Sequence, residues 1–291
     1  MKASRTAAIA LIVLVAETPT WATGTDRTRP TDVPLSSASH GEVVVPVFIA
    51  GEGPYRFILD TGSSHTAISQ TLATALGAVP VAMAPVATSV GSVLSLVIRL
   101  PGVAVGSAHV ESLLATALSP SAAGWLGDGI SGVLGQDFLS QFDYTLDYRT
   151  SRLSWNDAGR IEEGIRLALE SSQDRLLVRL PQSERCRCPV RLVPDSGASG
   201  VVLFADTEAD RLPIDPRGAS VSVSTLAGAG TAHRVTVREL RIGPDTLWDV
   251  PAARVALPAG TIEDGDGLLP LSLFARVSIY HREGYMVVQP K

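Results

Sequence analysis

Two short acidic motifs are the residues of this chain best suited to chemistry. Asp60 begins an Asp-Thr-Gly-Ser-Ser stretch and Asp195 begins an Asp-Ser-Gly-Ala-Ser stretch. One such triplet alone usually marks a tight turn, because Asp and Gly are both turn residues. Two carboxylates held close together cannot both ionise easily, so they share one proton. One then acts as a base toward water and the other as an acid toward a carbonyl oxygen, without metal or covalent intermediate.

The chain repeats itself, and the repeat gives the two motifs equivalent positions. The aspartates are 195 − 60 = 135 residues apart. The same offset relates Pro54 to Pro189, and Gly132-Val133-Leu134 to Gly267-Leu268-Leu269. Three separated features rarely match in one register by chance, so we infer an internal duplication. Equivalent points of two duplicated lobes meet at a pseudo-two-fold axis, and we predict that the two carboxylates face each other there.

Each copy contains the same order of expected elements. Alternating segments at residues 42–50 and 176–184 predict strands. A turn follows in each copy, and then a short apolar strand (residues 57–59 and 192–193) that runs into the aspartate. Each aspartate should therefore end a hairpin. A glycine-bearing hairpin, a short helical piece and a closing hairpin complete each copy.

This order predicts an all-β, bilobal fold with short helices, in which two lobes are related by a pseudo-two-fold axis. The lobes should span residues 41–157 and 176–291, with an inter-lobe linker at 158–175. Residues 1–22 have the basic start and apolar middle of a signal peptide, and the Thr-, Ser- and Pro-rich residues 23–40 predict a flexible leader. We expect an exported protein, periplasmic or secreted, without membrane contact after cleavage. An uncleaved anchor is the alternative.

The residues beside the aspartates suit a carboxylate pair. Those expected to support its loops are Thr61, Gly62, Ser63, Ser196 and Gly197. The glycines permit tight turns and close approach of the partner lobe. The hydroxyls of Thr61 and Ser196 could form hydrogen bonds across the axis. Ser63 could bond the outer oxygen of Asp60, whereas Ala198 has no hydroxyl, so we expect an asymmetric pair in which Asp60 is the more acidic member.

Three motifs carry a resemblance to a known family. The two aspartate motifs and Gly132-Val133-Leu134-Gly135 resemble the aspartic proteases of the retropepsin and pepsin clan. Residues 132–148 are similar to bacterial retropepsin-like domains in particular. The resemblance covers about residues 41–291. It implies a closed bilobal fold and an aspartic endopeptidase that hydrolyses a peptide or protein substrate in the cleft between its lobes.

The same resemblance implies that Gly91, Gly228 and Gly230 lie in flaps that close over substrate. Retropepsins assemble the pair from two identical chains, whereas here both halves occur in one chain, as in pepsins. We therefore expect a monomer, with an obligate homodimer as the alternative. Ala198 and Pro270 depart from the family pattern. They leave open a second reading, a non-catalytic exported binding module that retains the fold.

Other site types find little support. A net charge of −5 and 5% aromatic residues argue against nucleic-acid binding. Cys186 and Cys188 are the two cysteines. An exported compartment would permit a disulfide, although a two-residue separation is awkward unless a turn brings the pair closer. Two cysteines alone are a weak metal site, because zinc takes about four ligands. We expect no metal and no cofactor.

Overall fold

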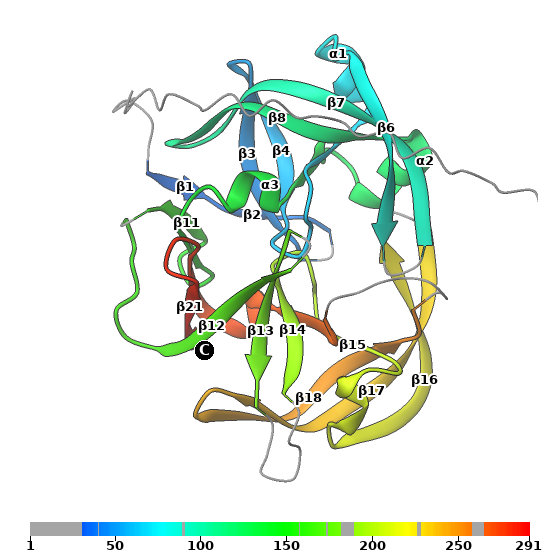
Figure 1. Cartoon of the computed structure of the whole chain (residues 1–291), viewed down its shortest axis with the longest axis vertical. Helices are drawn as coiled ribbons and strands as arrows, with labels where there is room; N and C mark the ends of the chain where they lie inside the picture. Colours follow the sequence, from blue (N-terminus) through cyan, green and yellow to red (C-terminus); the bar gives the residue numbers. More distant parts are fainter. Residues whose placement is uncertain are drawn as a thin grey trace, which may run out of the picture.

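Strands are the dominant element of the described part of the chain in the computed structural model. It describes residues 31–39, 41–88, 91–156, 158–172, 174–181, 189–225, 228–257 and 265–291. The helical pieces in these ranges are α1 (Gln70–Ala75), α2 (Pro120–Ala123), α3 (Gln136–Leu139) and the 3-10 turns η1 (Gly124–Leu126), η2 (Glu208–Arg211) and η3 (Leu271–Leu273). No helix in the described part of the chain is long and apolar enough to cross a membrane. The predicted all-β, bilobal fold is confirmed, and Figure 1 shows the lobes one above the other.

A closed ring of six strands forms the first lobe. In order around the ring, the strands are β3 (Val43–Ile49), β4 (Glu52–Leu59), β9 (Gly132–Leu134), β5 (Ala67–Ser69), β8 (Ala108–Leu118) and β7 (Gly91–Val105), which pairs back with β3. β2 (Ser36–Ser37) and β6 (Pro80–Thr88) extend this sheet. Val45, Val47 and Ile49 occupy alternate positions of β3 and are buried. The core of the lobe therefore follows the period of two expected for a strand.

The second lobe repeats this pairing. Its strands lie in the order β13 (Arg175–Leu180), β14 (Val190–Asp195), β19 (Gly267–Pro270), β15 (Val201–Phe204), β18 (Asp245–Val255), β17 (Gly228–Ile242) and β16 (Ile214–Thr225). The paired residues of β4 with β9, and of β14 with β19, correspond under the offset of 135. The pair that closes the first ring includes Phe48 and Ile49. Their counterparts, residues 183 and 184, lie outside the described ranges.

A sheet shared by both lobes fastens them together. It runs in the order β1 (Asp32–Pro34), β11 (Arg152–Trp155), β10 (Tyr144–Asp147), β20 (Phe274–Tyr280), β21 (Tyr285–Pro290) and β12 (Ile165–Ser172). Tyr144 of the first lobe lies opposite Ile279 of the second, and 279 − 144 = 135. This pair therefore lies on the pseudo-two-fold axis. Beside it, the hydroxyls of Thr145 and Ser278 are 2.5 Å apart and hydrogen-bonded.

Two stretches differ from the leader and linker that the sequence suggested. β1 and β2 lie within the expected flexible leader at 23–40, and β12 fills much of the expected linker at 158–175. The physical reason is that both stretches complete sheets. β1 pairs with β11 and buries Val33, while β12 pairs with β21 and buries Ile165 and Leu167. Residues 1–22, the expected signal peptide, lie outside the described residues, as do Cys186 and Cys188.

Candidate active site

The structure brings Asp60 and Asp195 together at the junction between the lobes. Asp60 follows β4 and Asp195 ends β14, and the two carboxyl groups are close enough for each to perturb the pKa of the other. A Cβ atom on Gly62 would lie 2.7 Å from Cγ of Asp195, and one on Gly197 would lie 3.0 Å from Cγ of Asp60. Each glycine therefore leaves the space that the carboxylate of the opposite lobe occupies.

Crossed hydrogen bonds hold the two aspartate loops against each other. Thr61 Oγ1 donates to the carbonyl oxygen of Pro194 at 2.7 Å and accepts from the N–H of Ser196 at 3.0 Å. Ser196 Oγ donates to the carbonyl oxygen of Leu59 at 2.6 Å and accepts from the N–H of Thr61 at 3.1 Å. The two halves of this network are identical under the offset of 135. Both hydroxyls are buried, so each loop is fixed by polar groups of the opposite lobe.

Backbone donors orient the two carboxylates in the same way. Oδ1 of each aspartate accepts from the N–H groups two and three residues later. For Asp60 these distances are 2.9 and 3.0 Å, and for Asp195 they are 2.7 and 3.0 Å. Each loop therefore holds one oxygen of its carboxylate in a fixed position with two N–H donors.

The Ser63 hydroxyl does not make the contact that the sequence suggested. It donates to the carbonyl oxygen of His65 at 2.9 Å and not to Asp60. A backbone acceptor two residues away is the easier partner for a short hydroxyl side chain. The side-chain difference between Ser63 and Ala198 therefore creates no direct asymmetry at the carboxylates.

Burial and mutual charge perturb both acids. Burial raises the pKa of Asp60, while the N–H of Gly62 and the hydrogen bond with Asp195 act in the opposite direction. Burial raises the pKa of Asp195 well above its ordinary value, and the charge of Asp60 raises it further. Both pKa values are raised, so these shifts do not decide which member is the more acidic, and that assignment stays a prediction. A pair perturbed in this way favours a single shared proton.

The first lobe anchors its aspartate loop with two residues that the sequence reasoning missed. Gln136 Nε2 donates to the carbonyl oxygen of Thr61 at 2.7 Å. The carboxylate of Asp137 accepts from the N–H and the hydroxyl of Thr66 at 2.8 and 2.6 Å. The counterpart of Gln136 in the second lobe is Leu271, which cannot make such a bond. Gln136 and Asp137 directly follow Gly135 in a stretch that resembles retropepsin-like domains, and this position was the signal in the sequence that could have identified them.

Pro270 has a simple physical explanation. In the first lobe, the N–H of Gly135 donates to Thr66 Oγ1 at 3.1 Å, and a Cβ on Gly135 would lie 2.6 Å from the carbonyl carbon of His65. The counterparts in the second lobe are Pro270, which has no N–H, and Val201, which has no hydroxyl. Donor and acceptor are thus absent together, and replacing both partners of a hydrogen bond by apolar groups can be nearly neutral.

Comparison with known proteins agrees with this geometry. A family model described as "Aspartyl protease" matches residues 45–138 and 186–273, which together make up more than half of the chain. The chain belongs to the aspartyl protease family. The two matched segments end at residues related by the offset of 135, so the family domain occurs twice and the resemblance read from the motifs is confirmed. A search of curated proteins found no match.

The glycines expected in flaps lie in two long hairpins of this aspartyl protease. Gly91 begins β7 and pairs with Thr88, while Gly228 begins β17 and pairs with Thr225. Gly230 lies two residues further along β17. Both hairpins lie along the right-hand edge of the view in Figure 1. Their positions correspond in the two lobes, and their use as flaps stays a prediction.

The described ranges contain no group of three or more His, Cys, Asp or Glu side chains placed to hold a metal ion. They do contain two neighbouring carboxyl groups, a buried one at Asp195 and a half-buried one at Asp60. Such a pair can take a proton from water and give one to an oxygen in the same event.

Proposed function

We propose that this aspartyl protease is an exported endopeptidase that activates water on an Asp60/Asp195 dyad sharing one proton. The observation that carries the proposal is the close approach of the two carboxyl groups at the junction of the lobes, where each lies against the glycine of the opposite loop and perturbs the pKa of the other. Peptide-bond hydrolysis needs a base for water and an acid for the carbonyl oxygen at the same pH. Two neighbouring acids that share one proton supply both.

The reaction follows from which member holds the proton. The ionised carboxylate accepts a proton from water as the water oxygen bonds to the scissile carbonyl carbon. The protonated carboxyl donates to the carbonyl oxygen, which gives a neutral tetrahedral intermediate. In the second step the newly protonated carboxyl gives its proton to the amide nitrogen while the other carboxylate takes a proton from a hydroxyl of the intermediate. The C–N bond breaks, and the dyad again holds one shared proton. Either member can hold the shared proton before the first step, because burial raises the pKa of both.

The surrounding groups support this chemistry by fixing its geometry. The crossed bonds of Thr61 and Ser196 prevent the two loops from separating, and the backbone N–H groups hold one oxygen of each carboxylate. Fixed groups need no reorganisation when charge moves. Because one chain supplies both carboxylates, we propose that a monomer acts on a peptide or protein in the cleft between the lobes.

Cleavage of a peptide library by single variants tests the proposal. Asp60→Asn and Asp195→Asn each remove one titrating group and keep the side-chain shape. We expect each to lower kcat/KM by roughly 10²–10⁴-fold, the usual contribution of general acid–base catalysis. Asp245→Asn, at the exposed start of β18, is the matched control and should cleave like wild type. Near-full activity in either dyad variant would show that the dyad does not catalyse cleavage.

The non-catalytic reading loses its main support. It rested on Ala198 and Pro270, but Ala198 supplies the same N–H to Asp195 that Ser63 supplies to Asp60. Pro270 is matched by the loss of the acceptor at Val201. Export is a separate part of the proposal and rests on the composition of residues 1–22. N-terminal sequencing of the protein purified from its cells should find a start near residue 23, and a chain that begins at Met1 in the cytoplasm would contradict export.

A further inference from the structure

A buried tyrosine hydroxyl lies near the dyad and is not used by the proposed mechanism. Tyr148 directly follows β10 of the first lobe, and its N–H donates to the carbonyl oxygen of Ala275 in the second lobe at 2.9 Å. Its hydroxyl oxygen is buried and has no hydrogen-bond partner among the described residues. The adjacent charged residues Asp147 and Arg276 are paired with each other at 3.2 Å. A buried hydroxyl without a partner is rare, because the lost contact with water is not replaced.

The carboxylate of Asp195 is close enough to act on this hydroxyl. Burial raises the pKa of Tyr148, and the negative charge of Asp195 raises it further. The phenol therefore keeps its proton at every pH at which carboxyl groups titrate. Toward an ionised carboxylate, a protonated phenol can only be the donor of a hydrogen bond. The first lobe thus places a neutral donor near the aspartate of the second lobe.

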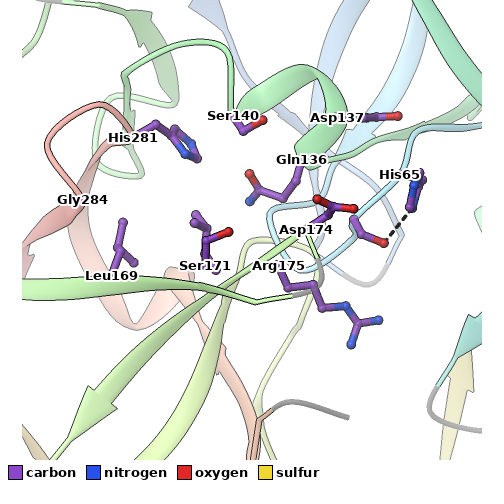
Figure 2. A pocket seen from close by; sticks show the side chains of 12 residues that line it. His65, Gln136, Asp137, Ser140, Leu169, Ser171, Asp174, Arg175, His281 and Gly284 are labelled. Carbon is purple, nitrogen blue, oxygen red and sulfur yellow. Dashed lines mark hydrogen bonds between the residues drawn. The ribbon is translucent and has the colours of Figure 1, made fainter. Parts of the chain in front are cut away.

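The other polar groups in this region act elsewhere. Arg175 and Gln136 line a cavity of about 470 Å³ between the lobes, and Figure 2 shows Gln136 projecting from α3 and Arg175 from the start of β13. The positive charge of Arg175 lowers the pKa of Asp60, the other member of the pair. Tyr144 lies near Tyr148, and a hydrogen bond joins its hydroxyl to the side chain of Gln136. The Tyr148 hydroxyl differs from both, because it is neither charged nor committed to a partner.

The arrangement occurs on one side of the pseudo-two-fold axis. The counterpart of Tyr148 under the offset of 135 is Glu283, whose exposed carboxylate pairs with Arg160 at 3.2 Å. The counterpart of Tyr144 is Ile279, which is apolar. The two aspartate loops match in their crossed bonds and backbone donors, but these positions of the second lobe offer no phenol to the first aspartate.

We propose that Tyr148 is a positioning residue for the dyad, whose hydroxyl donates a hydrogen bond toward Asp195 when that carboxylate is ionised. A buried water is the usual link between polar groups that do not touch directly. A donor of this kind favours the ionised form of an acid. The role rests on the proposed function, in which one carboxyl of the pair gives its proton to the carbonyl oxygen of the substrate and must then carry charge.

Titration of the aspartate carboxyl carbons by ¹³C NMR tests the proposal without any need for activity. Tyr148→Phe, in the full chain, keeps the ring and removes the hydroxyl. We expect the titration midpoint of Asp195 to rise by about one pH unit, the usual effect of losing a hydrogen bond to a charged group. Tyr280→Phe is the matched control, because its buried hydroxyl bonds the N–H and the carbonyl oxygen of Ile161 in a separate apolar cluster. It should lose stability and leave the midpoint of Asp195 unchanged.

The wild-type protein supplies a second readout that does not depend on folding of a Tyr148 variant. The Cζ signal of Tyr148 should shift as the dyad titrates, and this shift should be lost in Asp195→Asn. An unchanged Asp195 midpoint in Tyr148→Phe, or an equal rise in Tyr280→Phe, would overturn the proposal. A Tyr148 signal that does not follow the dyad, or follows it equally in Asp195→Asn, would do the same.

Cleavage assays separate this role from the proposed function. In an active enzyme, the pH profile of kcat/KM for Tyr148→Phe should move to higher pH by about as much as the NMR midpoint, about one unit, and an unmoved profile would contradict the role. Failure of the wild type to cleave would refute the proposed function, and the NMR titration would still decide whether Tyr148 acts on Asp195.

Discussion

The hydroxyl of Thr61 is the strongest single test of how the lobes are held together. Thr61→Val keeps the shape of the side chain and removes one oxygen atom. In the structure the hydroxyl donates a hydrogen bond to the carbonyl oxygen of Pro194 at 2.7 Å and accepts one from the N–H of Ser196 at 3.0 Å. Both groups would remain buried without a partner. Each such group costs about 1–3 kcal/mol, so the free energy of unfolding should fall by roughly 2–6 kcal/mol.

The assay is urea unfolding at equilibrium, followed by circular dichroism and by tryptophan fluorescence. Thr61→Ser is the matched control, because it keeps the hydroxyl and removes only a methyl group, worth about 1 kcal/mol. Ser196→Ala breaks the other half of the network, which serves the carbonyl oxygen of Leu59 and the N–H of Thr61. The pseudo-two-fold symmetry predicts that it costs about as much as Thr61→Val.

Two results would refute this reasoning. A loss below about 1 kcal/mol in Thr61→Val would mean that the two backbone groups find other partners. A large loss in Thr61→Val with none in Ser196→Ala would mean that the two halves of the network are not equivalent.

Three further predictions concern the dyad and its surroundings. Gly62→Ala should fold but lose most activity, since its Cβ would lie 2.7 Å from Cγ of Asp195; wild-type kcat/KM would contradict this. Asp195→Asn should unfold at higher urea than wild type near neutral pH and lose that advantage at about pH 3, because a raised folded pKa makes ionisation cost stability as pH rises. A less stable variant at neutral pH would count against it. The pKa of His281 is lowered from 6.5 to about 4, so the unfolded chain takes up the proton first when the pH is lowered. The free energy of unfolding should therefore fall by up to roughly 3 kcal/mol as the pH decreases from 6.5 to 4. His281→Phe should flatten this fall in urea titrations, and an unchanged pH dependence would exclude His281 as its source.

The fold could be read from the sequence where the pattern was local or repeated. The alternation of Val45, Val47 and Ile49 predicts a half-buried strand by itself. The offset of 135 needed no structure, whereas the strand register was needed to show that Tyr144 and Ile279 lie on the axis. Strands β1 and β12 could not be read in the same way. They form strands because their backbone N–H and C=O groups pair with β11 and β21, which are distant in the sequence. No local sequence pattern identifies those partners.

The candidate site was likewise only partly predictable from the sequence. The residue types of the aspartate motifs were enough to suggest a carboxylate pair, because the chemistry is in the side chains. The anchoring roles of Gln136 and Asp137 depend on contacts across about seventy residues of chain, with Thr61 and Thr66. Ser63 failed as a predicted contact for the opposite reason, since a local carbonyl oxygen at His65 competes for its hydroxyl.

Mixing the two dyad variants tests the central claim most directly. Asp60→Asn and Asp195→Asn are purified separately, and cleavage of the peptide library is measured for each and for their equimolar mixture. If one chain supplies both carboxylates, neither variant cleaves at an appreciable rate and the mixture is no better. Near wild-type cleavage by either variant alone, or recovery of cleavage on mixing, would contradict a dyad built from Asp60 and Asp195 of the same chain.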